Sequence, residues 1–306
     1  MTRQFLGLDL GGTRIKAVLL LADGTIIAEH QVATPKNRQI EDVLHALTAL
    51  YARFRDMSFT ITAVGIGAPG LIDRNGQRVR IAPNFPSWRD VPLQDLLQRE
   101  VEPPVFLDND VNCFAFAEHR WGAAQGFQNV IALTVGTGVG GALIINGSLF
   151  RGSSGAAGEL GHISVDLWGP ECACGNPGCI ERYIGERWFT LAAQETLGDD
   201  SIASPADISR LAQKGDLRAE EFIVGRGEIL GVACTSLIHA LDPEIIVIGG
   251  GIAQAGEPFF RGVRKSINER AYKILADQVK VTPAKLGTIA GAMGAAALGL
   301  NQVENP

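Results

Sequence analysis

The sequence has no lysine- or arginine-rich run, and its 27 basic residues are outnumbered by 33 acidic ones, for a net charge of −6. Binding to nucleic acid depends on a basic surface, so this charge balance does not favour a nucleic-acid partner. The sequence also has no signal-peptide pattern and no apolar stretch long enough to cross a membrane. We therefore expect a cytoplasmic protein with no membrane partner.

Cysteine is scarce, with five residues in 306, and no secretory signature accompanies it, so disulfides are not expected. Three of the five cysteines nevertheless lie within eight positions, and a histidine stands ten positions before the first of them. Gly175 and Gly178 allow sharp turns between these residues. Buried free thiols are the alternative, but four such side chains in one segment favour a closed, structural zinc site. The predicted ligands are His162, Cys172, Cys174 and Cys179.

The remaining composition, 46% hydrophobic and 20% charged, is typical of a globular chain that is long enough for two domains. Short apolar runs that end in glycine or aspartate indicate buried strands, and apolar residues at helical spacing indicate helices. The expected strands are 5–10, 15–21, 26–32, 61–66, 105–107, 130–135, 142–145, 245–248 and 279–281. The expected helices cover 43–54, 110–121, most of 186–240, 257–275 and 290–300. A strand, glycine turn and strand near residue 10 recur near residue 136, which suggests two duplicated α/β halves.

The two recurring glycine turns are candidate phosphate sites. Each joins a strand to a strand, so neither is a Walker loop or a dinucleotide fingerprint, which lie between a strand and a helix. Backbone amides in such turns can hold phosphate oxygens, and Asp9 could orient a hydrated Mg²⁺ ion. A plain hairpin turn is the alternative for either loop alone, and Lys16 is as readily a solvated charge. The predicted nucleotide contacts are Asp9, Gly11, Gly12, Thr13, Lys16, Gly136, Thr137, Gly138 and Gly250.

Asp110 is the predicted catalytic base. It follows a buried strand at the point where a helix begins, and the N-terminus of a helix favours an ionised carboxylate. Such a carboxylate can accept the proton of an alcohol while the alcohol oxygen attacks a phosphoryl group. The alternative is a helix cap, a part that either Asn109 or Asp110 could play.

Several short polar side chains near these positions suit the hydroxyl groups of a sugar. His162 can bind zinc through one ring nitrogen and a sugar hydroxyl or another protein group through the other. Trp88 is predicted to pack in the protein rather than to stack on a sugar. The predicted sugar contacts are Gly70, Asn84, Asn109, Asp110, Glu159, His162 and Glu181.

The motifs together resemble the ROK family of sugar kinases and repressors, which belongs to the actin-like ATPase superfamily. The matching segments are DLGGT at 9–13, ND at 109–110, TGVGG at 137–141, ELGH at 159–162, CACGNPGCIE at 172–181 and GGG at 249–251. The resemblance implies an α/β, two-domain actin-like ATPase (ribonuclease H-like) fold with a cleft between the domains. We expect residues 1–122, joined by the C-terminal helix 291–303, to form one domain. Residues 123–290, with the zinc-binding segment 162–179, are expected to form the other.

The resemblance also implies phosphorylation of a hexose at its 6-hydroxyl with ATP and Mg²⁺, with Asp110 as the base, by a homodimer or larger homo-oligomer. Segment 83–93 is most similar to the glucokinases of the family, so glucose is the predicted sugar. N-acetylmannosamine or N-acetylglucosamine kinases and fructokinases share many of the motifs and are the alternatives. Sugar-sensing repressors of the family carry a DNA-binding segment before the first phosphate loop. Here that loop begins at residue 9, so we expect an enzyme.

Overall fold

The computed structural model describes residues 3–57 and 59–304, which form two compact units. The first unit contains the described residues up to 126, residues 149–157 and the described residues from 286 onward; the second contains 127–148 and 158–285. The predicted domain limits stay a prediction, and the first two residues of the predicted domain 1–122 lie outside the described residues. Residues 149–157 group with the first unit, although the sequence analysis assigned them to the second domain.

A five-stranded sheet with the order β3-β2-β1-β4-β8 forms the centre of the first unit. Its strands are β1 (Gln4–Leu10), β2 (Arg14–Leu21), β3 (Ile26–Ala33), β4 (Ile61–Ala68) and β8 (Val105–Asn109). β1, β2 and β3 pair antiparallel, whereas β1, β4 and β8 are parallel. The carboxyl ends of β1, β4 and β8 therefore meet at one edge, where α/β proteins bind their ligands.

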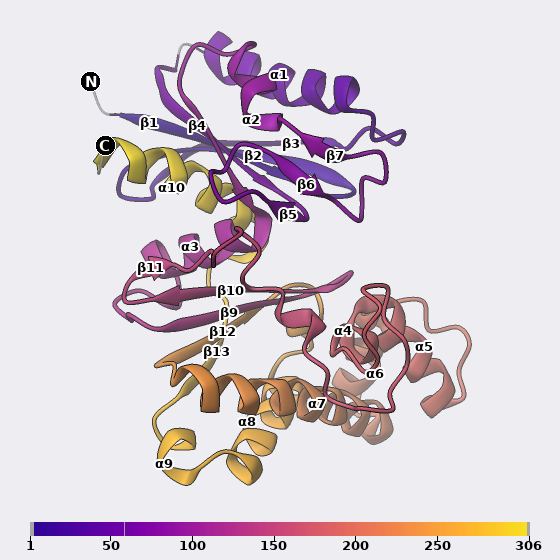
Figure 1. Ribbon diagram of the computed structural model, residues 1–306. Helices are drawn as coiled ribbons and strands as arrows, with labels where there is room; N and C mark the ends of the chain where they lie inside the picture. The colour runs from indigo at the N-terminus through magenta and orange to yellow at the C-terminus, as the bar shows by residue number, and fades with distance from the viewer. Residues whose placement is uncertain (1–2, 58, 305–306) are drawn as a thin grey trace. The chain divides into compact units, whose positions relative to one another are not determined.

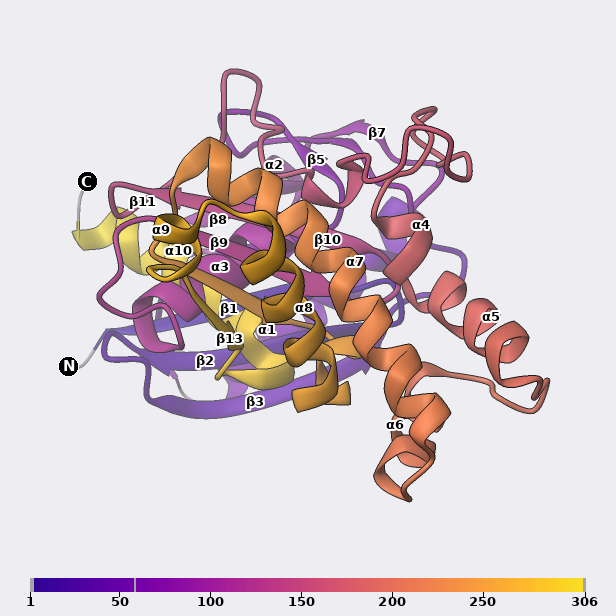
Figure 2. The same cartoon turned by 90° about the horizontal axis from the view of Figure 1, so that it is seen from below.

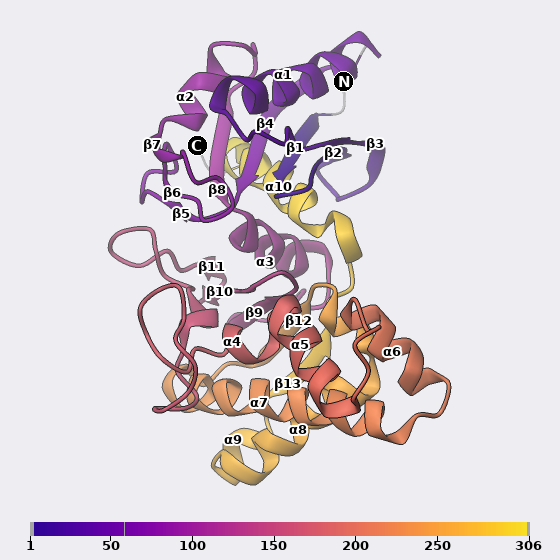
Figure 3. The ribbon, with the colours of Figure 1, turned by 90° about the vertical axis from the view of Figure 1, so that its right-hand side faces the viewer.

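Helices cover both faces of this sheet (Figures 1 and 3). On one face, α1 (Ile40–Asp56) buries Val43 and Leu47 against Leu6 and Leu8 of β1, and α2 (Leu93–Gln98) belongs to the same apolar core. On the other face, α3 (Asp110–Trp121) and α10 (Ala290–Glu304) pack with Phe5 of β1. The alternation of side chains along β1 explains how one strand supplies both cores.

Small residues allow α10 to lie close to its neighbours. A Cβ added at Gly7 or Gly65 would overlap the backbone of α10, and one added at Gly294 would overlap the carbonyl oxygen of Cys113 in α3. The carboxyl group of Glu118, at the other end of α3, is fully buried and accepts hydrogen bonds from Ala123 N and Leu286 N, at 2.7 and 2.8 Å. The end of α3 and the chain segment that leads into α10 are thus fixed together.

Gly294→Ala is expected to destabilise the protein by about 1–3 kcal/mol, because the added methyl group must displace the backbone of α3. The matched control is Gly225→Ala in α7 (Leu217–Leu241), where an added Cβ meets no atom within 4 Å. This control should be neutral or stabilising by up to about 1 kcal/mol, the helix propensity gained. Urea unfolding of both variants measures the difference, and equal stabilities would contradict the close packing of α10.

The sequence analysis did not predict a small antiparallel sheet in the first unit. It has the order β5-β6-β7 and is built from Leu71–Ile72, Val79–Ile81 and Arg89–Val91. These strands have two or three residues each, too few for alternation of polar and apolar residues to be recognised. Helix α2 was also missed, because it has only six residues.

The second unit repeats the topology of the first, as the duplicated pattern predicted. Its sheet has the order β11-β10-β9-β12-β13. The strands are β9 (Val130–Val135), β10 (Val139–Ile145), β11 (Ser148–Leu149), β12 (Ile245–Gly249) and β13 (Lys280–Pro283). β9 is antiparallel to β10 and parallel to β12, which is parallel to β13, so β9 and β10 correspond to β1 and β2.

Two long helices, α7 and α8, lie side by side in the second unit (Figure 2). The helices of this unit are α4 (Glu181–Ile184), α5 (Glu186–Leu197), α6 (Pro205–Gln213), α7 (Leu217–Leu241), α8 (Glu257–Arg270) and α9 (Lys273–Ala276). In the described part of the chain, only α7 has the length and apolar composition of a membrane span, which the sequence analysis did not anticipate. Of its most apolar window, 56% is buried inside the protein, as in a core helix.

Candidate active site and metal centre

Three carboxyl groups of the first unit gather at the carboxyl ends of its parallel strands. Asp9 of β1 is level with Gly67 of β4, and Gly67 is level with Asp108 of β8. Burial raises the pKa of the nearby Cys113 thiol well above its ordinary value, and the charges of Asp108, Asp9 and Asp110 raise it further. The predicted magnesium-orienting residue and the predicted base therefore lie near the same buried thiol.

Asn109, and not Asp110, caps helix α3. Its side-chain oxygen accepts hydrogen bonds from Val111 N at 2.8 Å and Asn112 N at 3.1 Å, and its Nδ2 donates to the carbonyl oxygen of Gly70 at 2.9 Å. Gly70 has a φ of +92°, and an added Cβ would overlap the backbone of residue 81, so this position requires glycine. Asn109 thus fixes the loop after β4. Asp110 is the first residue of the helix, so its carboxylate lies at the end that carries the partial positive charge of the helix.

An ion pair between a buried aspartate and a half-buried arginine, which the sequence analysis missed, supports these residues. Asp108 is 4% exposed, and its Oδ2 accepts hydrogen bonds from Nε and Nη2 of Arg151 at 2.8 and 2.5 Å. Its Oδ1 accepts from Asn109 N and from the side chain of Asn112, both at 2.8 Å. Arg151 follows no recognisable motif, but an aspartate directly before the Asn109-Asp110 pair was a signal that could have been used.

Arg38 connects the first glycine turn to the loop that carries Asn84. Its guanidinium donates to the carbonyl oxygens of Asn84 at 2.6 Å and Gly12 at 3.3 Å. The carbonyl oxygen of Arg38 in turn accepts a hydrogen bond from the Trp88 indole at 3.0 Å. Trp88 is fully buried against Phe85, with 4.7 Å between the ring centroids, which confirms that it packs in the core.

Hydrogen bonds within the β1–β2 turn use only part of its backbone amide groups. The Gly11 amide donates within the turn, to the carbonyl oxygens of Asp9 and Arg14 at 3.2 and 3.0 Å. Gly11 is thus a structural element of the turn, and the amides of Gly12 and Thr13 are the better candidates for phosphate.

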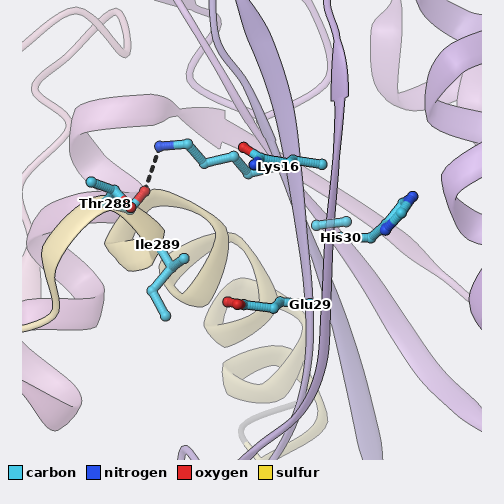
Figure 4. Close-up of a pocket in the computed structure, with 7 residues that line it drawn as sticks. Lys16, Glu29, His30, Thr288 and Ile289 are labelled. Atoms are coloured by element: carbon cyan, nitrogen blue, oxygen red, sulfur yellow. Dashed lines mark hydrogen bonds between the residues drawn. The ribbon is translucent and has the colours of Figure 1, made fainter.

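Lys16 borders a pocket of about 400 Å³ that is lined by residues of β2, β3 and the segment before α10 (Figure 4). Its Nζ donates to the carbonyl oxygen of Thr288 at 2.6 Å, at the turn of 3₁₀-helix, Gly287–Ile289, that precedes α10. Glu29 and Ile289 border the same pocket. The ammonium group therefore already has a partner, and a phosphate would have to compete with that carbonyl.

The Asp9 carboxyl group is unusually placed for an acid. Burial raises its pKa from 3.8 to about 6, and the charge of Lys16, level with it across the hairpin, acts in the opposite direction. The first turn of α10 lies against it, since an added Cβ at Gly291 would be 2.9 Å from the carboxyl group. At neutral pH the ionised form thus costs folding free energy, as is common where function requires a charge that is partly removed from water.

Asp9→Asn is expected to stabilise the fold by about 1–2 kcal/mol at pH 7.5. A folded pKa of about 6 against 3.8 when unfolded means that the carboxyl group contributes fully below about pH 4 and loses this contribution as the pH rises through 6. The gain from Asp9→Asn should therefore vanish near pH 4. Urea unfolding at several pH values tests this.

The control for Asp9→Asn is Asp23→Asn in the β2–β3 hairpin. Hydrogen bonds from Thr25 lower the pKa of the exposed Asp23, so its contribution has the opposite sign and is present above the unfolded pKa. A stability gain from Asp9→Asn that is the same at pH 4 and pH 7.5 would contradict the buried charge.

The second unit presents the second glycine turn at the ends of β9 and β12. Gly136 N donates to the carbonyl oxygen of Gly138 at 2.9 Å and closes the turn. Gly250, with a φ of +93°, lies against the backbone of Val135, at the end of β9. The predicted contacts Gly136, Thr137, Gly138 and Gly250 are therefore brought together within this unit.

The four predicted metal ligands converge in the second unit. Their ligand atoms all lie within 4.8 Å of one another, with Cys172 Sγ 3.6 Å from His162 Nδ1 and Cys174 Sγ 3.5 Å from Cys179 Sγ. A tetrahedral zinc ion with Zn–S bonds of about 2.3 Å would separate its sulfur ligands by about 3.8 Å, so the cluster fits this ion. Gly175 and Gly178 have φ values of +90° and +69°, the turns that the spacing predicted.

His162 turns its second nitrogen toward Glu159. Nδ1 faces the cysteines, and Nε2 lies 3.8 Å from Glu159 Oε2. Burial raises the pKa of Glu159, His162 lowers it and Glu181 raises it, so Glu159, His162 and Glu181 lie close together. One of these carboxylates is already engaged, because Glu181 Oε2 accepts a hydrogen bond from Val139 N at 2.9 Å.

Residues 5–302 match the sequence profile of the ROK family. The chain belongs to this family. A glucokinase from Thermotoga maritima is 34% identical over 310 residues, which cover 96% of each chain. A xylose repressor from Bacillus spizizenii is 32% identical over 292 residues, which cover 94% of this chain and 75% of the repressor.

A solved ROK structure agrees with the fold described above. The ROK family glucokinase from Streptomyces griseus, in complex with glucose and AMPPNP, is 34% identical, with a TM-score of 0.85 over 96% of this chain and 98% of that one. The agreement confirms the predicted α/β fold of the actin-like ATPase type. Within the ROK family, both kinases and repressors are thus relatives of this chain.

Proposed function

We propose that this protein is an ATP-dependent hexose kinase that phosphorylates the 6-hydroxyl group, with glucose as its preferred sugar. The main supporting observation is the position of Asp110, which is the first residue of α3, whereas Asn109 is the N-cap. A carboxylate in this position is suited to general-base chemistry, and it is not needed as the N-cap of the helix, because Asn109 is the cap. Glucokinase relatives that align over nearly the whole chain support the same activity.

In the proposed reaction Asp110 accepts the proton of the 6-hydroxyl as its oxygen attacks the γ-phosphoryl group of ATP. The amides of Gly12, Thr13, Thr137 and Gly138 are proposed to bind phosphate oxygens. Most of the rate enhancement then comes from alignment and from fixed dipoles that stabilise charge. Asn84, Glu159, His162 and Glu181 are proposed to contact the sugar hydroxyls, with Asn109 and Gly70 shaping the loop beside them.

Two metal ions complete the proposal. Mg²⁺ supplies charge neutralisation to ATP, and the Asp9 carboxylate is proposed to hold water molecules of its coordination shell. Zinc is proposed to bind His162, Cys172, Cys174 and Cys179, a set whose four ligands leave no position for chemistry. The bound zinc would instead orient the second nitrogen of His162.

A coupled assay of ADP release tests the proposal. Glucose, mannose, fructose, N-acetylglucosamine and N-acetylmannosamine are compared at equal concentration, and glucose should give the highest kcat/KM. If another sugar gives the highest kcat/KM, the protein is still a kinase, but that sugar is its preferred substrate. No ADP release with any of them would reject the kinase.

The xylose repressor relatives favour one second candidate, a sugar-responsive DNA-binding function. Electrophoretic mobility shifts with genomic DNA fragments separate the two. We expect no shift with or without sugar, together with ADP release in the assay above. We also propose a cytoplasmic homodimer or larger homo-oligomer, which light scattering of the purified protein would measure.

A further inference from the structure

The second glycine turn is held at both of its ends by one short segment of the second unit. The carbonyl oxygen of Gly136 accepts a hydrogen bond from Glu186 N at 2.8 Å. At the other end, Val139 N donates to Glu181 Oε2 at 2.9 Å. The turn itself contributes a single closing bond, from Gly136 N to the carbonyl oxygen of Gly138. The conformation of residues 136–139 therefore depends on residues 181–186, more than 40 positions away in the chain.

That segment continues directly from the metal cluster. Glu181 is two residues after Cys179, and the Cys179 thiol lies 3.4 Å from the carbonyl oxygen of His162. Between them, Ile180 is 1% exposed and its amide donates to the carbonyl oxygen of Ile163 at 2.9 Å. On its other side, the carbonyl oxygen of Glu181 accepts a hydrogen bond from Gly185 N at 2.9 Å, so the backbone of Glu181 is fixed directly after the cluster.

Because Gly138 has no side chain, there is room for the Glu181 carboxyl group beside it. A Cβ at this position would be 2.5 Å from Glu181 Oε2, so any larger residue would push the carboxyl group away from Val139 N. The hydrogen bond spans 42 positions of sequence and joins a half-buried carboxyl group to a backbone amide. A hydrogen bond from an amide to a charged acceptor is stronger than one between neutral groups, so it can select one conformation of a short turn.

We propose that Glu181 is a positioning residue for the nucleotide, through which the metal cluster sets the conformation of the 136–139 turn. By this account, loss of zinc lowers the affinity for nucleotide as well as for sugar. The inference rests on the proposed use of ATP, and it gives Glu181 a role additional to its proposed sugar contact. The Val139 amide is then engaged by Glu181, which leaves Thr137 and Gly138 to meet the phosphates.

Calorimetric titration with AMPPNP and Mg²⁺ in sugar-free buffer tests the inference, because sugar contacts cannot contribute there. Removing zinc with a chelator should weaken AMPPNP binding by the wild-type protein about 5- to 50-fold, which is within the usual range of coupling between two sites. In the zinc-loaded protein, Glu181→Ala should cause a similar loss. Removing zinc from Glu181→Ala should add less than about twofold, since the connection is already broken.

Two further variants make the test specific. Glu181→Gln in the zinc-loaded protein retains an oxygen that can accept from Val139 N, so it should keep most of the affinity that Glu181→Ala loses. Glu171→Gln, an exposed residue of the same segment, should bind AMPPNP as the wild type does, with and without zinc. If the zinc-free protein unfolds, the Ala and Gln variants still test whether Glu181 positions the turn for the nucleotide.

The outcomes separate the inference from the proposed function. Unchanged AMPPNP affinity in zinc-loaded Glu181→Ala would overturn the inference while leaving the kinase intact. Losses from zinc removal and from Glu181→Ala that multiply would also overturn it, because the two changes would then act independently. Failure of the zinc-loaded wild type to bind AMPPNP at all would reject the proposed function itself.

Discussion

Asp110→Asn is expected to lower kcat by about 10²- to 10⁴-fold, the usual contribution of a general base. The amide has nearly the same shape but cannot accept the proton of the sugar hydroxyl. Its effect on folding should be small, because the cap of α3 is made by Asn109. The KM for sugar should therefore change little, and steady-state kinetics with a coupled ADP assay measure both constants.

Asp95→Asn is the matched control for this variant. Asp95 is also an aspartate in the first turn of a helix, α2, but it is exposed and outside the site. It should retain wild-type kinetics. Near-normal kcat in Asp110→Asn would refute the role of base, and a rise in KM with unchanged kcat would indicate a sugar-binding role instead.

Arg151→Ala is expected to destabilise the fold by about 3 kcal/mol, because it leaves the buried Asp108 carboxylate without its cation. This cost is at the low end of the range for buried pairs, because the Arg151 side chain is 38% exposed and solvent partly screens its charge. Residues 149–157 should also become more accessible, because Arg151 is their charged anchor to the first unit. Urea unfolding and limited proteolysis of the variant measure the two effects.

A double variant separates the ion pair from loss of packing. Asp108→Asn combined with Arg151→Ala removes both charges, and should be more stable than Arg151→Ala alone. Arg55→Ala, which breaks an exposed pair with Asp56, is the control and should cost less than about 1 kcal/mol. If Arg151→Ala costs no more than Arg55→Ala, the buried pair does not stabilise the fold.

Much of the fold could be predicted because its signals are local. The apolar strands ending in glycine or aspartate, and the spacing of Val43, Leu47 and Phe54, gave the two central sheets and α1. The duplicated glycine turns indicated the repeated topology. Strands β5 to β7 were missed because two or three residues hold no periodicity. Residues 149–157 belong to the first unit, and Arg151 of this segment pairs with Asp108 across 43 positions, a contact that no local pattern shows.

Some features of the candidate site could also be predicted from the sequence, and others only from the structure. Ligand types and spacing within one segment were enough to predict the metal cluster, since four side chains over 18 positions have few other ways to converge. The position of Asp110 at the start of a helix followed from the strand before it. Its distinction from Asn109 did not, because two adjacent polar residues compete for one cap and backbone geometry decides.

The sequence by itself determined the family, the metal ligands and the two glycine turns, because each is written in residues that are neighbours along the chain. Only the tertiary structure decided which distant groups support them: Arg151 on Asp108, Arg38 on the loop of Asn84, and Glu181 on Val139. Those partners are set by the topology of the sheets, which brings together residues that no local pattern connects. A single hydrogen bond of this kind has no periodicity, and so leaves no trace in the sequence.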